Sequence, residues 1–140
     1  MTEGALIQTG FGADSTIWDV VAGIDLTGKR AIVTGGSSGI GVETARALAA
    51  VGAEVTLAVR DPAAGERTAA EIRTATHGAA VSVGLLDLAD LASIGAFIAA
   101  WDGPLHLLID NAGVMRIPSL ERVGRGWERQ FATTTSVISP

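Results

Sequence analysis

The sequence predicts an α/β fold built on an open parallel sheet, and three observations support this. Hydrophobic residues make up 48% and charged residues 18% of the 140 residues, which is enough apolar surface for one core and excludes a disordered chain. The apolar residues are mainly alanine, valine, leucine and isoleucine beside 18 glycines, a mixture typical of layered helices and strands. Short apolar runs alternate with helical patterns, which indicates strands joined by helical crossovers.

Residues 1–27 are expected to form an N-terminal extension that carries one short helix. Residues 1–12 show no hydrophobic periodicity, which predicts a loosely held tail. Asp14 or Ser15 can cap a helix that runs to about Ala22, because the apolar residues of this segment share one helical face.

Strands and helices then alternate up to Ile109. Short apolar runs that end in glycine or proline turns predict buried parallel strands, and segments with apolar residues on one side predict helices. The predicted strands are residues 30–34, 54–59, 80–86 and 105–109, and the predicted helices are residues 42–51, 64–76 and 91–101. A last helix is expected within residues 120–131, weakened by Gly124 and Gly126.

Right-handed crossovers between these strands give the order 3-2-1-4, with four strands in an incomplete sheet. The chain reverses its direction across the sheet between the first and fourth strands, and ligands bind at such a switch point. Residues at the carboxyl ends of these strands are therefore the first candidates for a site.

Charge and cysteine content exclude several classes of function. The net charge of −5 and the lack of any lysine or arginine run argue against a nucleic-acid partner. The chain has no cysteine, so it can form neither a disulfide nor a thiolate metal site, and a cytoplasmic location is expected. No basic region precedes the first apolar patch, and the longest apolar helical stretch, residues 91–101, is too short to cross a membrane. His77 and His106 are expected to be a helix C-terminal residue and a strand residue, and no metal site is assigned.

A glycine loop follows the first predicted strand. Residues 34–41 read Thr-Gly-Gly-Ser-Ser-Gly-Ile-Gly, and the lack of Cβ atoms lets a pyrophosphate approach the backbone. The following helix N-terminus supplies N–H donors and a positive dipole. The spacing Gly-x-x-x-Gly-x-Gly differs from Gly-x-Gly-x-x-Gly, and the Lys-Ser/Thr ending of a P-loop is missing.

At this loop the sequence resembles the short-chain dehydrogenase/reductase family, whose loop reads Thr-Gly-x-x-x-Gly-x-Gly. Two further motifs resemble that family: Asp87-Leu88 after the third strand, and Asp110-Asn111-Ala112-Gly113 after the fourth, where the family has Asn-Asn-Ala-Gly. The resemblance covers about residues 27–131. It implies a Rossmann-like, doubly wound sheet and an oxidoreductase that transfers hydride between a carbonyl/alcohol pair and a dinucleotide.

The resemblance also implies which residues bind the cofactor. They are Gly35, Ser37, Ser38, Gly39, Ile40, Gly41, Arg60, Asp87, Leu88, Asn111, Ala112 and Gly113. Asp110 departs from the family's first asparagine, and because a carboxylate cannot donate hydrogen bonds, the bonds between this turn and the glycine loop are expected to change. Residues 28–133 are thus expected to form an NADP-binding half-domain.

Arg60 favours NADP over NAD. It ends the second predicted strand, where an NAD enzyme places a carboxylate on the ribose 2′-hydroxyl, and an arginine there suits a 2′-phosphate. The alternative is a solvated loop residue that pairs with Asp61 or Glu66.

No catalytic residue is assigned in this chain. In the family, catalysis uses asparagine, serine, tyrosine and lysine, but the sequence has no tyrosine and a single lysine, Lys29, before the first strand. Residues 126–133 resemble a family segment that continues Asn-His-Leu-Gly-His-Phe-Ala, whereas Thr134 replaces the asparagine here. Deletion of one base from codons for that continuation can give Thr-Thr-Ser-Val-Ile-Ser-Pro. We therefore expect residues 134–140 to be an aberrant tail from a shifted reading frame; the alternative is a natural short domain with a threonine-rich tail.

Two functional interpretations follow from these observations. The first is an NADP-dependent oxidoreductase of the short-chain type that is truncated and inactive as this chain. The second is a non-catalytic module that binds a nucleotide, or that binds a partner through the exposed edge of its fourth strand. The sequence does not point to a substrate.

Overall fold

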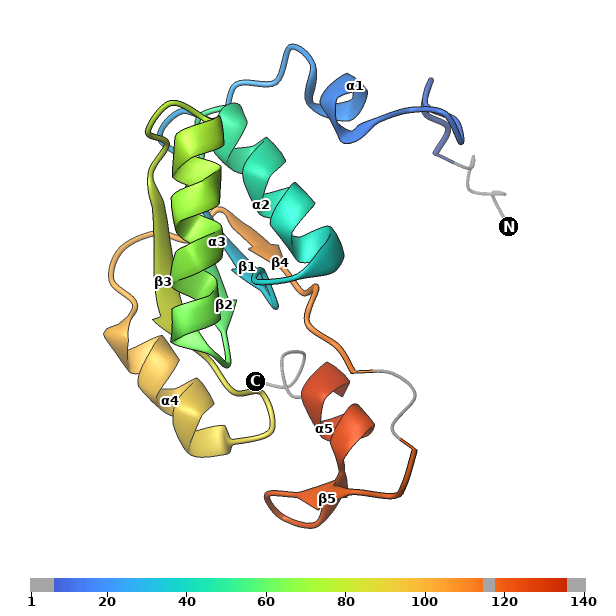
Figure 1. The fold of residues 1–140 in the computed structure, drawn as a ribbon, viewed down its shortest axis with the longest axis vertical. Helices are drawn as coiled ribbons and strands as arrows, with labels where there is room; N and C mark the ends of the chain where they lie inside the picture. The colour runs from blue at the N-terminus through green and yellow to red at the C-terminus, as the bar shows by residue number, and fades with distance from the viewer. Residues whose placement is uncertain (1–6, 115–117, 136–140) are drawn as a thin grey trace, which may run out of the picture.

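The computed structural model describes residues 7–114 and 118–135. Four parallel strands form one sheet in the order β3-β2-β1-β4, which confirms the predicted topology (Figure 1). The strands are β1 (Arg30–Thr34), β2 (Glu54–Val59), β3 (Val81–Leu85) and β4 (Leu107–Ile109), and the helices between them are α2 (Gly39–Ala50), α3 (Pro62–Ala75) and α4 (Leu91–Ala100). In β1, Val33 lies opposite Leu57 of β2 and Ile109 of β4.

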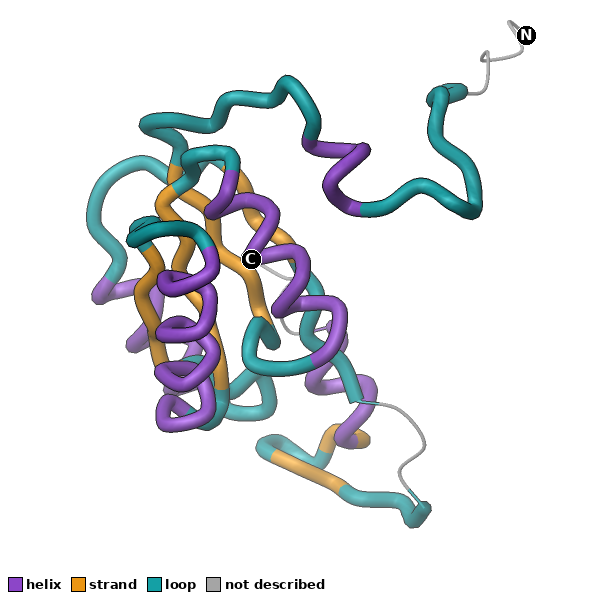
Figure 2. The backbone as a smooth tube through the Cα atoms, turned by 45° about the horizontal axis from the view of Figure 1, so that its top comes forward, coloured by secondary structure: helices purple, strands orange, loops and turns teal. Residues whose placement is uncertain are grey.

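Alternate residues of each strand face opposite sides of the sheet and form two apolar clusters. Helices α2 and α3 cover one side, where Val33, Leu57 and Ile72 are fully buried (Figures 1 and 2). Helix α4 covers part of the other side, where Ile32 and Leu86 meet its partly buried aromatic residues. The sheet and the helices on its two sides therefore form three layers. Because the four strands are parallel, their carboxyl ends all lie on the same side of the molecule.

Acidic side chains define where two of the crossover helices begin. Asp61 accepts hydrogen bonds from the N–H groups of Ala63 and Ala64, so α3 begins at Pro62, two residues earlier than predicted. Asp90 accepts from the N–H of Ala92 and caps α4, as its position predicts. The bounds of β1 and β2 match the predicted ones, and the remaining bounds differ by at most three residues, which is close to the usual uncertainty at element ends.

The N-terminal extension carries helix α1 (Ile17–Val21), which lies beside α2 in Figure 1. The prediction that Asp14 or Ser15 caps this helix is wrong, because Thr16 accepts from the N–H of Asp19 and the Asp19 carboxylate accepts from the N–H of Thr16. None of its residues is buried. Part of the predicted N-terminal tail, residues 1–6, lies outside the described residues.

The predicted helix at residues 120–131 is wrong. Strands β5 (Arg122–Val123) and β6 (Trp127–Glu128) form a small antiparallel hairpin there, and a short helix, α5 (Arg129–Thr135), follows. The physical reason is the turn, since Gly124 and Gly126 have φ values of 54° and 88° and cannot continue a right-handed helix. Along the described ranges, no helix is both long enough and apolar enough to cross a membrane.

Candidate functional site

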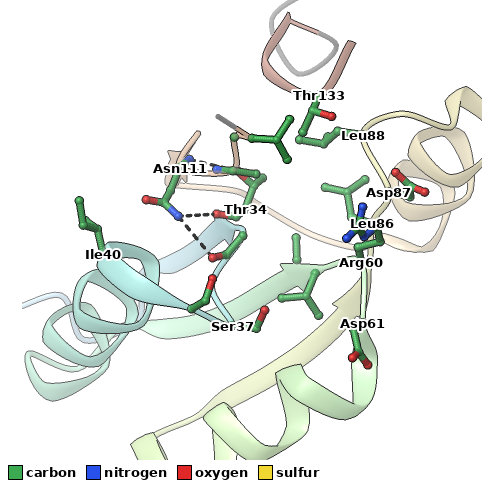
Figure 3. A pocket seen from close by; sticks show the side chains of 17 residues that line it. Thr34, Ser37, Ile40, Arg60, Asp61, Leu86, Asp87, Leu88, Asn111 and Thr133 are labelled. Carbon is green, nitrogen blue, oxygen red and sulfur yellow. Dashed lines mark hydrogen bonds between the residues drawn. The ribbon is translucent and has the colours of Figure 1, made fainter. Parts of the chain in front are cut away.

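A pocket of about 410 Å³ lies at the carboxyl ends of β1, β2 and β3, beside the segment that follows β4 (Figure 3). Its wall combines the glycine loop, the ends of the neighbouring strands and one residue of α5. The lining residues are Thr34, Gly35, Ser37, Ser38, Ile40, Ala58, Val59, Arg60, Asp61, Leu86, Asp87, Leu88, Asn111, Ala112, Gly113, Val114 and Thr133. The pocket therefore occupies the crevice at which open parallel sheets bind ligands.

Thr34 and Asn111 join the glycine loop to the segment after β4. The Thr34 hydroxyl, which is almost fully buried, accepts from the N–H groups of Asn111 at 3.1 Å and Ala112 at 3.0 Å. The Asn111 amide donates back to the carbonyl oxygens of Thr34 at 3.1 Å and Gly35 at 3.3 Å. Figure 3 shows these two bonds as dashed lines. Asn111 rather than Asp110 provides this connection, and Asp110 is exposed.

Two glycines let these segments approach one another. A Cβ on Gly35 would lie 2.9 Å from the Cα of Ala112, and its φ of 65° also favours glycine. A Cβ on Gly41 would lie 2.5 Å from the Asn111 amide nitrogen and 2.6 Å from the Gly35 carbonyl oxygen. Gly41 thus packs beneath the loop and does not line the pocket.

The N-terminus of α2 is suited to an anion. Ser38 precedes the helix in an extended conformation, yet its side chain makes no capping hydrogen bond, and the first turn carries no acidic residue. Neither the Ser38 side chain nor an acidic side chain of the first turn therefore competes with a bound anion for the first N–H groups of the helix. Together with the positive end of the helix dipole, these groups favour a phosphate beside Ser37 and Ser38.

Arg60 and Asp61 lie at the end of β2 on the pocket rim (Figure 3). Asp61 is engaged in capping α3, and Glu66 lies 3.6 Å from Arg73 in a separate ion pair. Among the described residues Arg60 has no ion pair, so neither predicted alternative partner holds it. The Arg60 guanidinium is exposed at one end of the pocket.

Asp87 and Leu88 form the wall that follows β3. The N–H of Asp87 donates to the Ser93 hydroxyl at 2.9 Å, and its carboxylate Oδ1 accepts from the N–H of Ala89 at 3.0 Å. Leu86 and Leu88 are 8% and 6% exposed and pack into the apolar cluster under α4. These hydrogen bonds and the packing of the two leucines hold the wall in place. The wall presents both a carboxylate and apolar surface to the pocket.

Ten of the twelve residues proposed from the sequence line this pocket, and Gly39 and Gly41 do not. Sequence reasoning missed lining residues at strand ends and on α5: Thr34, Ala58, Val59, Asp61, Leu86, Val114 and Thr133. The strand-end residues could have been found from the rule that ligands bind at carboxyl ends. No sequence pattern marked Thr133 as a lining residue, because its position beside the pocket depends on the hairpin β5–β6, which was not predicted.

The other candidate groups lie away from the pocket. His106 precedes β4 at the opposite end of the sheet, where its Nδ1 accepts from the N–H of Arg30 at 3.0 Å. His77 follows α3 with a φ of 56°, and Lys29 precedes β1. Across residues 7–114 and 118–135, no three histidine or acidic side chains are grouped as a metal site would require.

A second hollow, of about 880 Å³, lies under α4 and is lined by residues that include Arg30, Phe97 and Trp101. It has no glycine loop at its wall, and the helix N-terminus that it does include, that of α4, is already capped by the Asp90 side chain. The smaller pocket is therefore the better candidate site, because it combines close backbone approach, free N–H donors and a cation.

The chain matches the family model described as short chain dehydrogenase over residues 29–138. A protein of Streptomyces antibioticus named "probable oxidoreductase" is 51% identical over 110 residues, which cover 79% of this chain and 37% of that protein. The matched segment therefore spans less than half the length of this relative.

Two solved structures show the same arrangement. An uncharacterised protein from Mycobacterium paratuberculosis superposes with a TM-score of 0.70 at 37% identity, over 78% of this chain and 38% of that chain. The Pseudomonas aeruginosa RhlG/NADP active-site complex superposes with a TM-score of 0.64 at 30% identity, over 81% of this chain and 43% of that chain.

Proposed function

The chain belongs to the short-chain dehydrogenase family, and from this premise we propose that it binds NADP in the pocket at the carboxyl ends of its strands. The observation that carries the proposal is the unpaired Arg60 at one end of a pocket whose other side is a glycine loop and an uncapped helix N-terminus. A solved relative that superposes on this chain is described as an NADP complex.

The residues present fit the parts of the dinucleotide. The backbone of Gly35 and the N-terminus of α2 suit the pyrophosphate, and Arg60 suits the 2′-phosphate. Asp87 and Leu88 suit the adenosine, and the segment from Asn111 to Val114, which lines the same pocket, suits the part of the dinucleotide beyond the pyrophosphate. When bound, the cofactor supplies or accepts hydride in exchange with a carbonyl or alcohol carbon. The part of this chain in that reaction is to bind and orient the cofactor.

Substitution of Arg60 by alanine tests the cofactor preference. Wild-type chain is expected to bind NADPH more tightly than NADH, and Arg60→Ala should reduce that ratio roughly 10- to 100-fold, because a charge-assisted hydrogen bond contributes about 1.5–3 kcal/mol. NADH affinity should stay unchanged. Calorimetric titration measures both constants, with Arg67→Ala as a control cation outside the pocket. An unchanged ratio in Arg60→Ala contradicts the assignment.

We also propose that this 140-residue chain does not catalyse hydride transfer on its own. The sequence has no tyrosine, and Lys29 lies before β1, at the opposite end of the sheet from the pocket. With NADPH and a panel of aldehydes and ketones, purified chain should show no NADPH oxidation above the uncatalysed rate. Turnover that survives repurification and scales with chain concentration refutes this.

The proposed change of reading frame at Thr134 has a direct test. Resequencing of the encoding DNA across Thr133 and Thr134 should reveal a downstream frame that encodes a serine and a Tyr-x-x-x-Lys segment. Downstream DNA that encodes no such segment in any frame refutes the frame shift and supports the natural short domain.

The second candidate function, partner binding, rests on the edge of the sheet. In the described part of the chain β4 pairs only with β1, and Leu105 and Leu108 near this edge are 42% and 47% exposed. Unpaired strand edges with apolar neighbours associate with other strands. Light scattering should show association that grows with concentration and decreases in Leu108→Lys.

A further inference from the structure

Contacts at the base and near the turn hold the hairpin β5–β6 together. The N–H of Arg129 donates to the Glu121 carbonyl at 2.9 Å, and the Arg129 guanidinium lies 2.6 Å from the Glu121 carboxylate. At the other end, the Arg122 guanidinium donates to the Gly126 carbonyl at 2.8 Å. A two-residue ribbon is too short to be stable alone, so these bonds define its shape.

Glu128 connects this hairpin to helix α5. It is the last residue of β6, and its two carboxylate oxygens accept from the N–H groups of Gln130 at 2.9 Å and Phe131 at 2.8 Å. These donors belong to the first turn of α5, where backbone N–H groups have no partner within the helix. A seven-residue helix is marginal without such a cap.

Helix α5 contributes to the wall of the pocket, and the hairpin lies beside the residue that follows this wall. A Cβ on Gly124, at the hairpin turn, would lie 3.2 Å from the carbonyl oxygen of Ala89, directly after Leu88. On α5, Ala132 is 2% exposed, and Thr133 lines the pocket. Figure 3 shows Thr133 at the same end of the pocket as Leu88.

We propose that Glu128, together with the Glu121–Arg129 pair, positions the wall at the adenosine end of the pocket, through α5 and Thr133. None of the three side chains lines the pocket, so each acts through another residue. The inference rests on the proposed function, because it assigns the adenosine of the dinucleotide to the space between Thr133 and Leu88.

The charge of Glu128 gives this arrangement a pH dependence. Hydrogen bonds from the N–H groups of Gln130 and Phe131 hold the pKa of Glu128 below its ordinary value of 4.5. A lowered folded-state pKa means that the cap contributes fully above about pH 4.5 and is lost as the pH falls through the folded-state pKa. A fall in pH should therefore loosen α5 first. The hydrogen bonds between the glycine loop and Asn111 involve no carboxylate, so they should persist.

Substitution of Glu128 by alanine tests the proposal with two probes. Adenosine 2′,5′-bisphosphate should bind roughly 3- to 10-fold more weakly, which corresponds to about 0.7–1.4 kcal/mol, because loss of the cap loosens the wall that α5 forms. Inorganic pyrophosphate, which suits the glycine loop, should bind equally to both chains. Glu128→Asp should restore nucleotide affinity, because aspartate is a good helix cap. Asp19→Ala, which removes the carboxylate that accepts from the N–H of Thr16 at the start of α1, is the matched control and should change neither affinity.

A second readout needs no ligand. The Cα chemical shifts of Ala132 and Thr133 should move toward coil values in Glu128→Ala and return in Glu128→Asp. Unchanged shifts, or equal weakening of both probes, overturn the inference. If wild-type chain binds neither probe, the nucleotide proposal and the adenosine assignment fail together, and the shifts still decide whether Glu128 holds α5.

Discussion

Gly41→Ala is expected to weaken NADPH binding roughly 10- to 100-fold and to destabilise the fold. The added methyl group would lie 2.5 Å from the Asn111 amide nitrogen, 2.6 Å from the Gly35 carbonyl oxygen and 3.1 Å from the Gly36 Cα. Two of these three atoms are backbone, so the loop must move, and overpacking of this kind costs about 1–3 kcal/mol. NADPH binding needs the original conformation of the loop, so the strain weakens the affinity. Each 1.4 kcal/mol of strain corresponds to about a tenfold loss of affinity.

The matched control is Gly95→Ala in the middle of α4. A Cβ there meets no atom within 4 Å, so this change should leave affinity unchanged and stabilise the helix by up to about 1 kcal/mol. Calorimetric titration gives the affinities, and urea unfolding gives the stabilities. Wild-type affinity in Gly41→Ala shows that the loop does not hold the cofactor in the described conformation.

Arg30→Ala is expected to lower the free energy of unfolding by about 1–3 kcal/mol, the second large effect. The Arg30 guanidinium lies 4.3 Å from the centre of the Trp101 ring and 3.3 Å from the Glu54 carboxylate, and it donates to the carbonyl oxygens of Asp102 and Pro104. One side chain thus joins the starts of β1 and β2 to the segment between α4 and β4. Each contact contributes about 0.5–1 kcal/mol where partly exposed.

Two variants separate packing from charge in this prediction. Lys29→Ala removes the neighbouring exposed cation and should change stability by less than about 0.5 kcal/mol. Arg30→Lys keeps the charge but loses the planar guanidinium, and its stability should fall between those of wild type and Arg30→Ala. If urea unfolding gives Arg30→Ala and Lys29→Ala the same free energy of unfolding, Arg30 does not stabilise the connection between the strand starts and the segment after α4.

The strands and their order could be predicted because the two central strands, β1 and β2, are largely apolar and buried. Val55 to Val59 are buried without interruption, and this pattern marks a parallel strand covered on both sides. The helix start at Asp90 follows from side-chain chemistry that is visible in the sequence, whereas the start of α3 was predicted two residues too late, at Ala64. The glycine loop and the residues after β3 and β4 could be placed at one edge because parallel strands end together.

The hairpin and Thr133 could not be predicted in the same way. Leu120 to Phe131 has apolar residues at helical spacing, but Gly124 and Gly126 turn the chain with positive φ, and Glu121 pairs with Arg129 across the hairpin base. Such contacts depend on the folded chain and leave no periodic signal. The role of Thr16 as the cap of α1 was missed because Asp14, Ser15 and Thr16 are all good caps, and only the position of Asp19 distinguishes them.

The central claim, that the pocket at the carboxyl ends of the strands binds a dinucleotide, is tested most directly by NMR. Uniformly labelled chain is titrated with NADPH, and the backbone amide signals are followed. We expect the largest changes at Gly35 to Ile40, Arg60, Asp87 with Leu88, and Asn111 to Gly113. No change at millimolar NADPH, or changes confined to the hollow under α4 around Phe97 and Trp101, would contradict the account.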